Sequence, residues 1–262
     1  MTAETRGAHH ARTAYARLVL ETMPEESRLG LTLGFVRTFG IPEIARVLYG
    51  TGRMTSEPRA RAKATGVAMF TLIGQGLNSP EGRGTVEALR RIHDRPDITP
   101  ELMHYVLACF TVCPLRFIDT HGQRAVTDAE REAAYGFHLG LSDALGLPEP
   151  PGGGHPGGGH PDGARLDGAR LDGVEEWMRG YEADRFAPTE EARALWRSAS
   201  RGLLAARLPA PLAALAPAVA ASLLDAPLGR ALQVRRPPAP VRALVIRALR
   251  SRARARAAGG GG

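Results

Sequence analysis

The apolar positions of this 262-residue chain nowhere alternate with polar ones at the two-residue period of a half-buried β-strand. Residues that begin or end helices recur instead. Pro42, Pro80 and Pro100 each stand at a first helical turn before an apolar run. Thr127-Asp128-Ala129-Glu130 forms a capping box, and Gly146 ends the helix that follows it. The sequence therefore predicts an all-α protein.

The segment 56–76, SEPRARAKATGVAMFTLIGQG, is predicted to be a helix with polar residues next to an apolar stripe. Arg61 and Thr65 are four residues apart, so they project from one face about one turn apart. Met69 and Leu72 continue that face inward. This pattern fits a polar site, and it equally fits a solvated arginine beside a core stripe.

A histidine ends the next predicted helix, 80–93. Val86, Leu89 and His93 follow helical spacing, so His93 falls on the buried side. The residue is either a ligand or a core histidine. His104 and His138, on neighbouring apolar helices, compete for the same role.

Other chemical signals are weak. His121 lies in a polar turn and is a poorer ligand candidate. Cys109 and Cys113 sit four apart in an apolar run, which is typical of free, buried cysteines in a reducing compartment. The sequence has no phosphate-binding loop after a strand, no serine nucleophile elbow and no carboxylate pair poised for acid–base chemistry.

Composition changes along the chain and suggests domain limits. We expect a flexible N-terminus at 1–13, a helical domain at 14–250 and a basic, Gly-rich disordered tail at 251–262. Residues 148–173, PEPPGGGHPGGGHPDGARLDGARLDG, read as a Gly/Pro-rich inserted loop without a packed core. The two histidines of this tract, His155 and His160, lack further ligands at metal-binding spacing.

The net charge of +7 is concentrated near the C-terminus. From Asp225 onward there are nine arginines and one acid, so the rest of the chain is close to neutral. This distribution argues against nucleic-acid binding by the whole fold.

The hydropathy of the chain indicates in which cellular compartment the protein is expected. The N-terminal residues have no apolar stretch of the kind found in signal peptides. The later apolar segment 203–224 is interrupted by Pro209, Pro211 and Pro217, which does not suit a membrane-spanning helix. We therefore expect a cytoplasmic protein, with peripheral contact at the inner face of the membrane as an open alternative.

Several segments, in order, resemble the MpaB-type oxygenase family, which is related to the rubber oxygenase known as latex clearing protein. The central run RRIHDRPDITPELMHYVLACFTVCPLRFIDTHGQRAVTDAEREAAYGFHLGLSDALGLPE carries most of the resemblance. GFVRTFGIPEIARVLYGTGRMTSEPRARAKAT precedes it, and EEWMRGYEADRF and LLDAPLGRAL follow. The resemblance implies a single multi-helix domain enclosing haem b, which cleaves carbon–carbon double bonds of terpenoid or polyisoprene substrates with dioxygen.

The same resemblance implies roles for particular residues. The rubber oxygenases carry Arg-x-x-Lys-Thr on one helix and an iron-binding histidine on the next. Here Arg61 and Thr65 match as catalytic residues on the distal side, and His93 matches as the haem and iron ligand. The lysine position holds Ala64. Lys63 is shifted by one residue, which turns it about 100° around the helix.

Two other functions stay open at this point. A protein with Ala64 and few polar pocket residues could bind haem or a hydrophobic ligand without catalysis. Alternatively, the C-terminal segment could act as a peripheral membrane anchor. There an apolar stripe (Val241, Leu244, Val245, Ala248 and Leu249) lies beside several arginines, a pattern that favours contact with an anionic membrane. The same stripe could equally pack on the domain.

Overall fold

The computed structural model describes residues 14–149, 169–201 and 215–259. Within these ranges the chain is helical and contains no strand, which confirms the predicted all-α class. The elements in chain order are η1 (Leu18–Thr22), α2 (Pro24–Arg37), η2 (Thr38–Gly40), α3 (Pro42–Gly50), α4 (Arg53–Ser56), α5 (Pro58–Gln75), α6 (Pro80–His93), α7 (Pro100–His121), α8 (Asp128–Leu145), α9 (Ala169–Arg185), α10 (Glu190–Ala199), α11 (Ala216–Ser222), α12 (Ala226–Ala231) and α13 (Ala239–Gly259).

Local capping explains where several helices begin and end. The side chains of Ser79 and Thr99 accept hydrogen bonds from the backbone of the first turns of α6 and α7. Thr127 and Glu130 form the predicted capping box at the start of α8. Gly146 ends α8 with φ 72°, a left-handed conformation that glycine adopts without strain.

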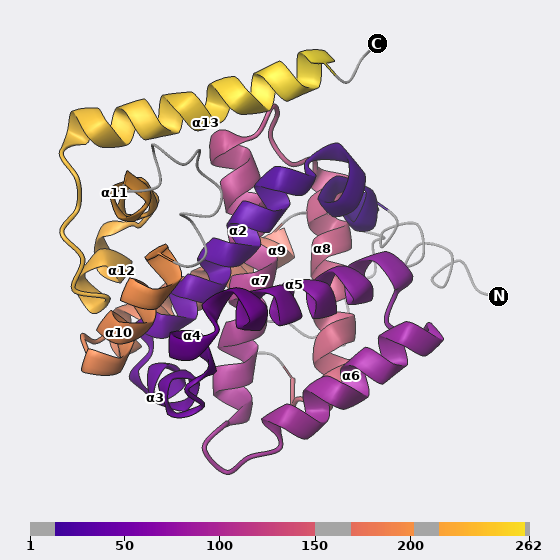
Figure 1. Cartoon of the computed structure of the whole chain (residues 1–262). Helices are drawn as coiled ribbons and strands as arrows, with labels where there is room; N and C mark the ends of the chain where they lie inside the picture. The colour runs from indigo at the N-terminus through magenta and orange to yellow at the C-terminus, as the bar shows by residue number, and fades with distance from the viewer. Residues whose placement is uncertain (1–13, 150–168, 202–214, 260–262) are drawn as a thin grey trace.

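α7 is the central helix, and α2 crosses it closely (Figure 1). A Cβ added at Gly30 would lie 2.4 Å from the Cα of Pro114, and one at Gly34 would lie 2.5 Å from the carbonyl oxygen of Cys109. The two helix backbones can therefore approach this closely only because both positions lack a side chain.

α7 is also the one helix of the described residues that is long and apolar enough to cross a membrane by length and composition. Inside the protein, 78% of its apolar window is buried, as expected of a core helix. Most of the apolar segment 203–224, which the prolines exclude as a span, lies outside the described residues.

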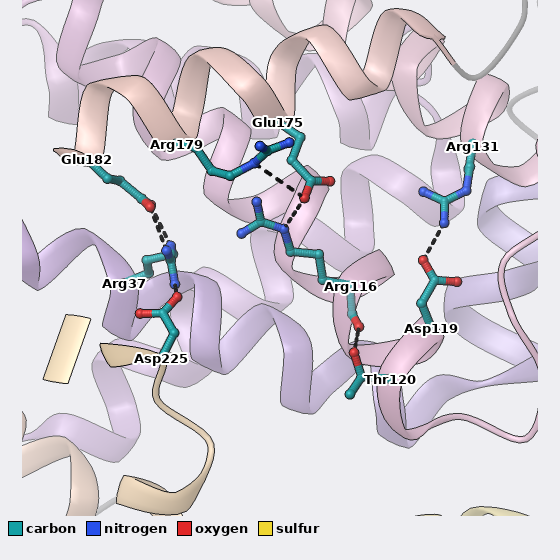
Figure 2. A network of polar contacts seen from close by, with 9 residues as sticks. All are labelled: Arg37, Arg116, Asp119, Thr120, Arg131, Glu175, Arg179, Glu182 and Asp225. Atoms are coloured by element: carbon teal, nitrogen blue, oxygen red, sulfur yellow. Dashed lines mark hydrogen bonds and ion pairs between the residues drawn. The ribbon is translucent and has the colours of Figure 1, made fainter. Parts of the chain in front are cut away.

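A buried ion network joins α2, α9 and the residue that caps α12 (Figure 2), and α7 contributes a hydroxyl to it. Arg37 of α2 donates to both carboxylate oxygens of Glu182 on α9 and, at 2.7 Å, to Asp225 before α12. The hydroxyl of Tyr105 on α7 donates to the same Glu182 at 2.9 Å. Removing Arg37 would leave the buried carboxylate of Glu182 without a cation, so we assign this network to the fold.

Two predicted boundaries are wrong. The insert was expected to reach residue 173, but α9 begins at Ala169, and Leu171 is 3% exposed. The second DGARL repeat supplies Ala, Arg and Leu, which favour helix, beside a core that accepts the leucine. The tail was expected to be disordered from 251, but α13 continues to Gly259 because Arg and Ala are both strong helix formers.

The helices α3, α4, α5 and α6 lie on one side of α7 (Figure 1). α5 and α6 lie in front of α7 and α8, and α3 and α4 stand beside them (Figure 1). These six helices are the ones that position the candidate site.

Candidate functional site

A cavity of about 680 Å³ lies among α3, α4, α5, α6, α7 and α8. Its lining is mostly aliphatic, and the side chains of Ile44, Leu89, Leu102 and Leu141 come from four of these helices. Such a size and lining are typical of a small-molecule site. Arg61, Thr65 and His93, the three predicted site residues, all line this one cavity.

His93 is the last residue of α6 and is partly buried. Its Nδ1 lies 2.8 Å from the carbonyl oxygen of Leu89. Because a carbonyl can only accept, Nδ1 carries the proton in the neutral ring, and Nε2 keeps its lone pair. Burial, together with the charge of Arg61, holds the pKa of His93 below its ordinary value, against the opposing effect of the Leu89 hydrogen bond. A neutral imidazole with a free Nε2 is the form that binds a metal.

Arg61 and Thr65 form a pair on α5. The guanidinium of Arg61 donates from Nη1 to the Thr65 hydroxyl and stands over the ring of Phe35, 5.5 Å from its centroid. Burial lowers the pKa of Arg61, and the nearby charge of Arg53 lowers it further. The pair therefore places a cation and a hydroxyl at the wall of an apolar cavity.

The lysine position of the family pattern also faces the cavity. Ala64 and Lys63 are both exposed, but only Ala64 is among the residues that line the cavity. The rotation expected from a one-residue shift on a helix accounts for this difference.

Two lining arginines were missed by the sequence analysis. Arg53, in the four-residue helix α4, and Arg95, in the α6–α7 connection, both line the cavity. Helical periodicity assigns no face to so short a helix or to a connection, so no signal in the pattern could have found them.

The competing histidines lie elsewhere. His104 on α7 and His138 on α8 are buried, at 3% and 2% exposed, but neither lines the cavity. His138 approaches the Thr111 hydroxyl at 3.2 Å. His121, at the end of α7, packs its ring against Phe117. His155 and His160 lie outside the described residues.

Clusters of metal-binding side chains are absent from the described part of the chain. No three His, Cys, Asp or Glu residues come together there in a way that could hold an ion. Cys109 and Cys113 are both free and buried, as the sequence predicts.

Comparison with known proteins gives one family. Residues 27–255 match the family model described as "ER-bound oxygenase mpaB/B'/Rubber oxygenase, catalytic domain". This match extends over most of the chain and includes Arg61, Thr65 and His93.

Individual fungal proteins are also similar. The chain is 29% identical over 185 residues to the ER-bound oxygenase mpaB of Penicillium brevicompactum, which covers 67% of this chain and 45% of that protein. It is 29% identical over 167 residues to mpaB' of the same organism, covering 60% and 37%. It is 33% identical over 119 residues to mpaB of Penicillium roqueforti (strain FM164), covering 42% and 39%. The chain thus spans less than half the length of these relatives.

Proposed function

We propose, from the premise that this chain belongs to the family of mpaB and rubber oxygenase catalytic domains, that it is a haem-dependent oxygenase. Its substrate would be an apolar, terpenoid-like molecule that is oxygenated or cleaved at a carbon–carbon double bond by dioxygen. The observation that carries the proposal is that Arg61, Thr65 and His93, from two different helices, line one largely aliphatic cavity.

The residues present fit haem b. The porphyrin supplies four ligands to its iron, so the protein needs to provide only one, and His93 offers an Nε2 with a free lone pair. The carbonyl of Leu89 fixes the tautomer and orientation of that ring. The aliphatic lining suits the macrocycle, and the lining arginines suit the negative charge of its propionates.

Bound haem would supply the one-electron and dioxygen chemistry that no protein side chain provides. The chain's own residues set the conditions for it. His93 stays neutral because burial opposes its protonation. Arg61 and Thr65 present donors that stabilise negative charge developing in the cavity. The aliphatic walls exclude water and hold an apolar substrate near the reacting position.

A second function is favoured by one observation. Ala64 lines the cavity at the family's lysine position, so the cavity lacks that amine. A chain without it could bind haem or a hydrophobic ligand and not turn over. The two functions separate in an assay of the haem-loaded protein with an olefinic terpenoid, because only the oxygenase consumes dioxygen in proportion to substrate oxidised.

The haem assignment is tested by titrating the purified chain with haem and recording the Soret band. We expect about one haem per chain. His93→Ala should abolish this spectrum or weaken binding strongly, since the iron loses its protein ligand.

His93→Gly with added imidazole serves as the matched rescue. Free imidazole should restore the axial ligand and the spectrum in this variant. If His93→Ala binds haem with an unchanged spectrum, His93 is not the ligand, and His104 and His138 become the residues to test next.

A further inference from the structure

The cavity is apolar, yet its charged residues are all of one sign. Arg53, Arg61 and Arg95 line it, and no Asp or Glu is among its lining residues. Arg53 and Arg95 are also exposed, so they stand where the cavity opens to solvent. An apolar chamber with a cationic mouth is suited to a ligand with an apolar body and an anionic end.

Arg53 is the arginine whose position the fold leaves unexplained. It follows Gly52, whose φ of 68° turns the chain into α4. Arg95 donates to both carboxylate oxygens of Asp97 at 2.9 and 2.7 Å, whereas the guanidinium of Arg53 makes no hydrogen bond or ion pair with any residue that the structure describes.

Arg53 also acts on Arg61. Its charge is close enough to lower the pKa of the Arg61 guanidinium, with burial as the larger cause. Arg61 has hydrogen bonds to Thr65 and a ring contact with Phe35, but no acid neutralises it within the described chain. Two guanidinium groups that repel each other beside an apolar cavity cost free energy, and an anion bound between them would recover it.

We propose that Arg53, at the mouth of this cavity, and Arg61, on its wall, form a carboxylate-binding site. A guanidinium presents parallel N–H donors that match the two oxygens of a carboxylate, and such charge-assisted pairs are stronger than neutral hydrogen bonds. The ligand is therefore an apolar molecule that ends in a carboxylate. The proposal deepens the proposed function, on which it rests for the location of the ligand.

The carboxylate has two sources, a propionate of haem or the acidic end of an olefinic substrate. Two measurements on the full chain distinguish them. The first compares the affinities for haem and for haem dimethyl ester, by Soret titration. The second compares farnesoic acid with methyl farnesoate at pH 7.5, by calorimetry on the chain with and without haem. Each pair of probes differs only in the carboxylate.

The variants isolate the charge of Arg53. Arg53→Gln removes it. Arg53→Lys keeps the charge but lacks the parallel N–H donors of a guanidinium. Arg46→Gln is the matched control, because Arg46 is exposed on α3 and does not line the cavity. Thermal melts establish that all three variants fold.

Arg53→Gln should weaken binding of the free acid from one source about tenfold (about 1.4 kcal/mol) and leave the ester unchanged. The affinity of Arg53→Lys for the free acid should lie between those of the parent and Arg53→Gln, and the affinity of Arg46→Gln should equal that of the parent. A tenfold loss confined to haem assigns the site to a propionate, and one confined to farnesoic acid assigns it to the substrate. If the loss is confined to farnesoic acid and the chain binds no haem, the proposed function is wrong, but the carboxylate-binding site is supported. Equal affinities of acid and ester in both pairs, or no effect of Arg53→Gln on either acid, would overturn the proposal.

Discussion

At the scale of single residues, the site depends on which nitrogen of His93 is free. The contact from Nδ1 to the Leu89 carbonyl stays within α6, so it forms wherever a histidine ends this helix in the same rotamer. It leaves the lone pair of Nε2 free without help from a distant carboxylate. The pair formed by Arg61 and Thr65 is equally local, because its members are four residues apart on α5.

Arg61 and Thr65 should affect chemistry more than haem content. With haem supplied in excess, Arg61→Ala and Thr65→Val should each retain the Soret band and lower turnover by about 10²- to 10³-fold, the usual cost of losing a donor that stabilises developing charge. Thr65→Ser keeps the hydroxyl and is the matched control. Parental turnover of an olefinic substrate by both Arg61→Ala and Thr65→Val would show that the distal assignment is wrong.

His138 should make the fold sensitive to acid. Burial, followed by the charge of His104, lowers the pKa of His138 from 6.5 to about 4. The unfolded state therefore binds its proton more tightly, so stability is unaffected above about pH 7 and falls as the pH drops from 6.5 toward 4. The loss is about 2 kcal/mol at pH 5.

Denaturant unfolding between pH 7.5 and 4.5 measures this loss. His138→Gln should lower stability at neutral pH, since the contact between the Thr111 hydroxyl and the imidazole is lost, but should flatten the pH dependence. If the variant and the parent lose stability in parallel, His138 does not titrate in this range.

At the scale of elements, the residues of α13 that are buried are not the same set as the apolar stripe that the sequence suggested. Val245, Leu249 and Ala253, four residues apart, follow one face of α13 and are partly or fully buried, and Arg242 and Ile246 are partly buried as well. Arg250 donates to the Thr120 carbonyl at 2.8 Å, and Arg256 pairs with Glu26. One face of α13 therefore packs on the domain.

The opposite face of α13 is the one that is free to contact a membrane. Leu244, 66% exposed, shares this outward face with Arg247, Ser251 and Arg254, which are also exposed. Of these four residues, two are charged and only Leu244 has a large apolar side chain. Contact with an anionic membrane stays a prediction, and the structure gives it an electrostatic basis rather than an apolar one.

Vesicle co-sedimentation tests the contact. The chain should pellet with vesicles that contain phosphatidylserine, and less so at high salt, because each basic residue near such a surface contributes about 1 kcal/mol. Arg247→Gln with Arg254→Gln should weaken pelleting, whereas Arg46→Gln with Arg91→Gln, which removes the same charge elsewhere, should not. Equal pelleting of both double variants, or of a chain cut after Pro240, would reject the role of α13.

At the scale of the whole molecule, the first turns of α9 belong to a stretch of simple composition, yet they contribute side chains to the core. Leu171 and Val174 are 3% and 2% exposed, although the first belongs to the DGARL repeat. The boundary between expendable and structural chain therefore falls before α9 and not after Gly173.

Two deletions test this boundary. Replacing residues 152–167 by a short linker should change the melting temperature little, since its Gly/Pro composition contributes few apolar groups and loop-closure entropy varies slowly with length. Extending the deletion to 173 should lower it by at least about 4 °C, because loss of a buried leucine costs about 2 kcal/mol or more. Equal melting temperatures for the two deletions would show that Leu171 adds nothing to stability.

The sequence by itself determined the helical class, the starts of α3, α6, α7 and α8, and the end of α8, and it singled out Arg61, Thr65 and His93, which line one cavity. These depend on contacts within a few residues: Thr127 caps its own helix, and Arg61 reaches Thr65 one turn away. Such local interactions are encoded in spacing, so they can be predicted without knowledge of the fold.

Only the tertiary structure decided which buried histidine faces the cavity. His93, His104 and His138 all lie on apolar helical faces, but His93 alone of the three lines the cavity. Helical periodicity indicates that a face is buried and does not indicate which helix covers it. For the same reason the sequence could not place Arg53 beside Arg61, Leu171 in the core or Val245 against the body, because each depends on contacts between segments that are distant or have no regular period.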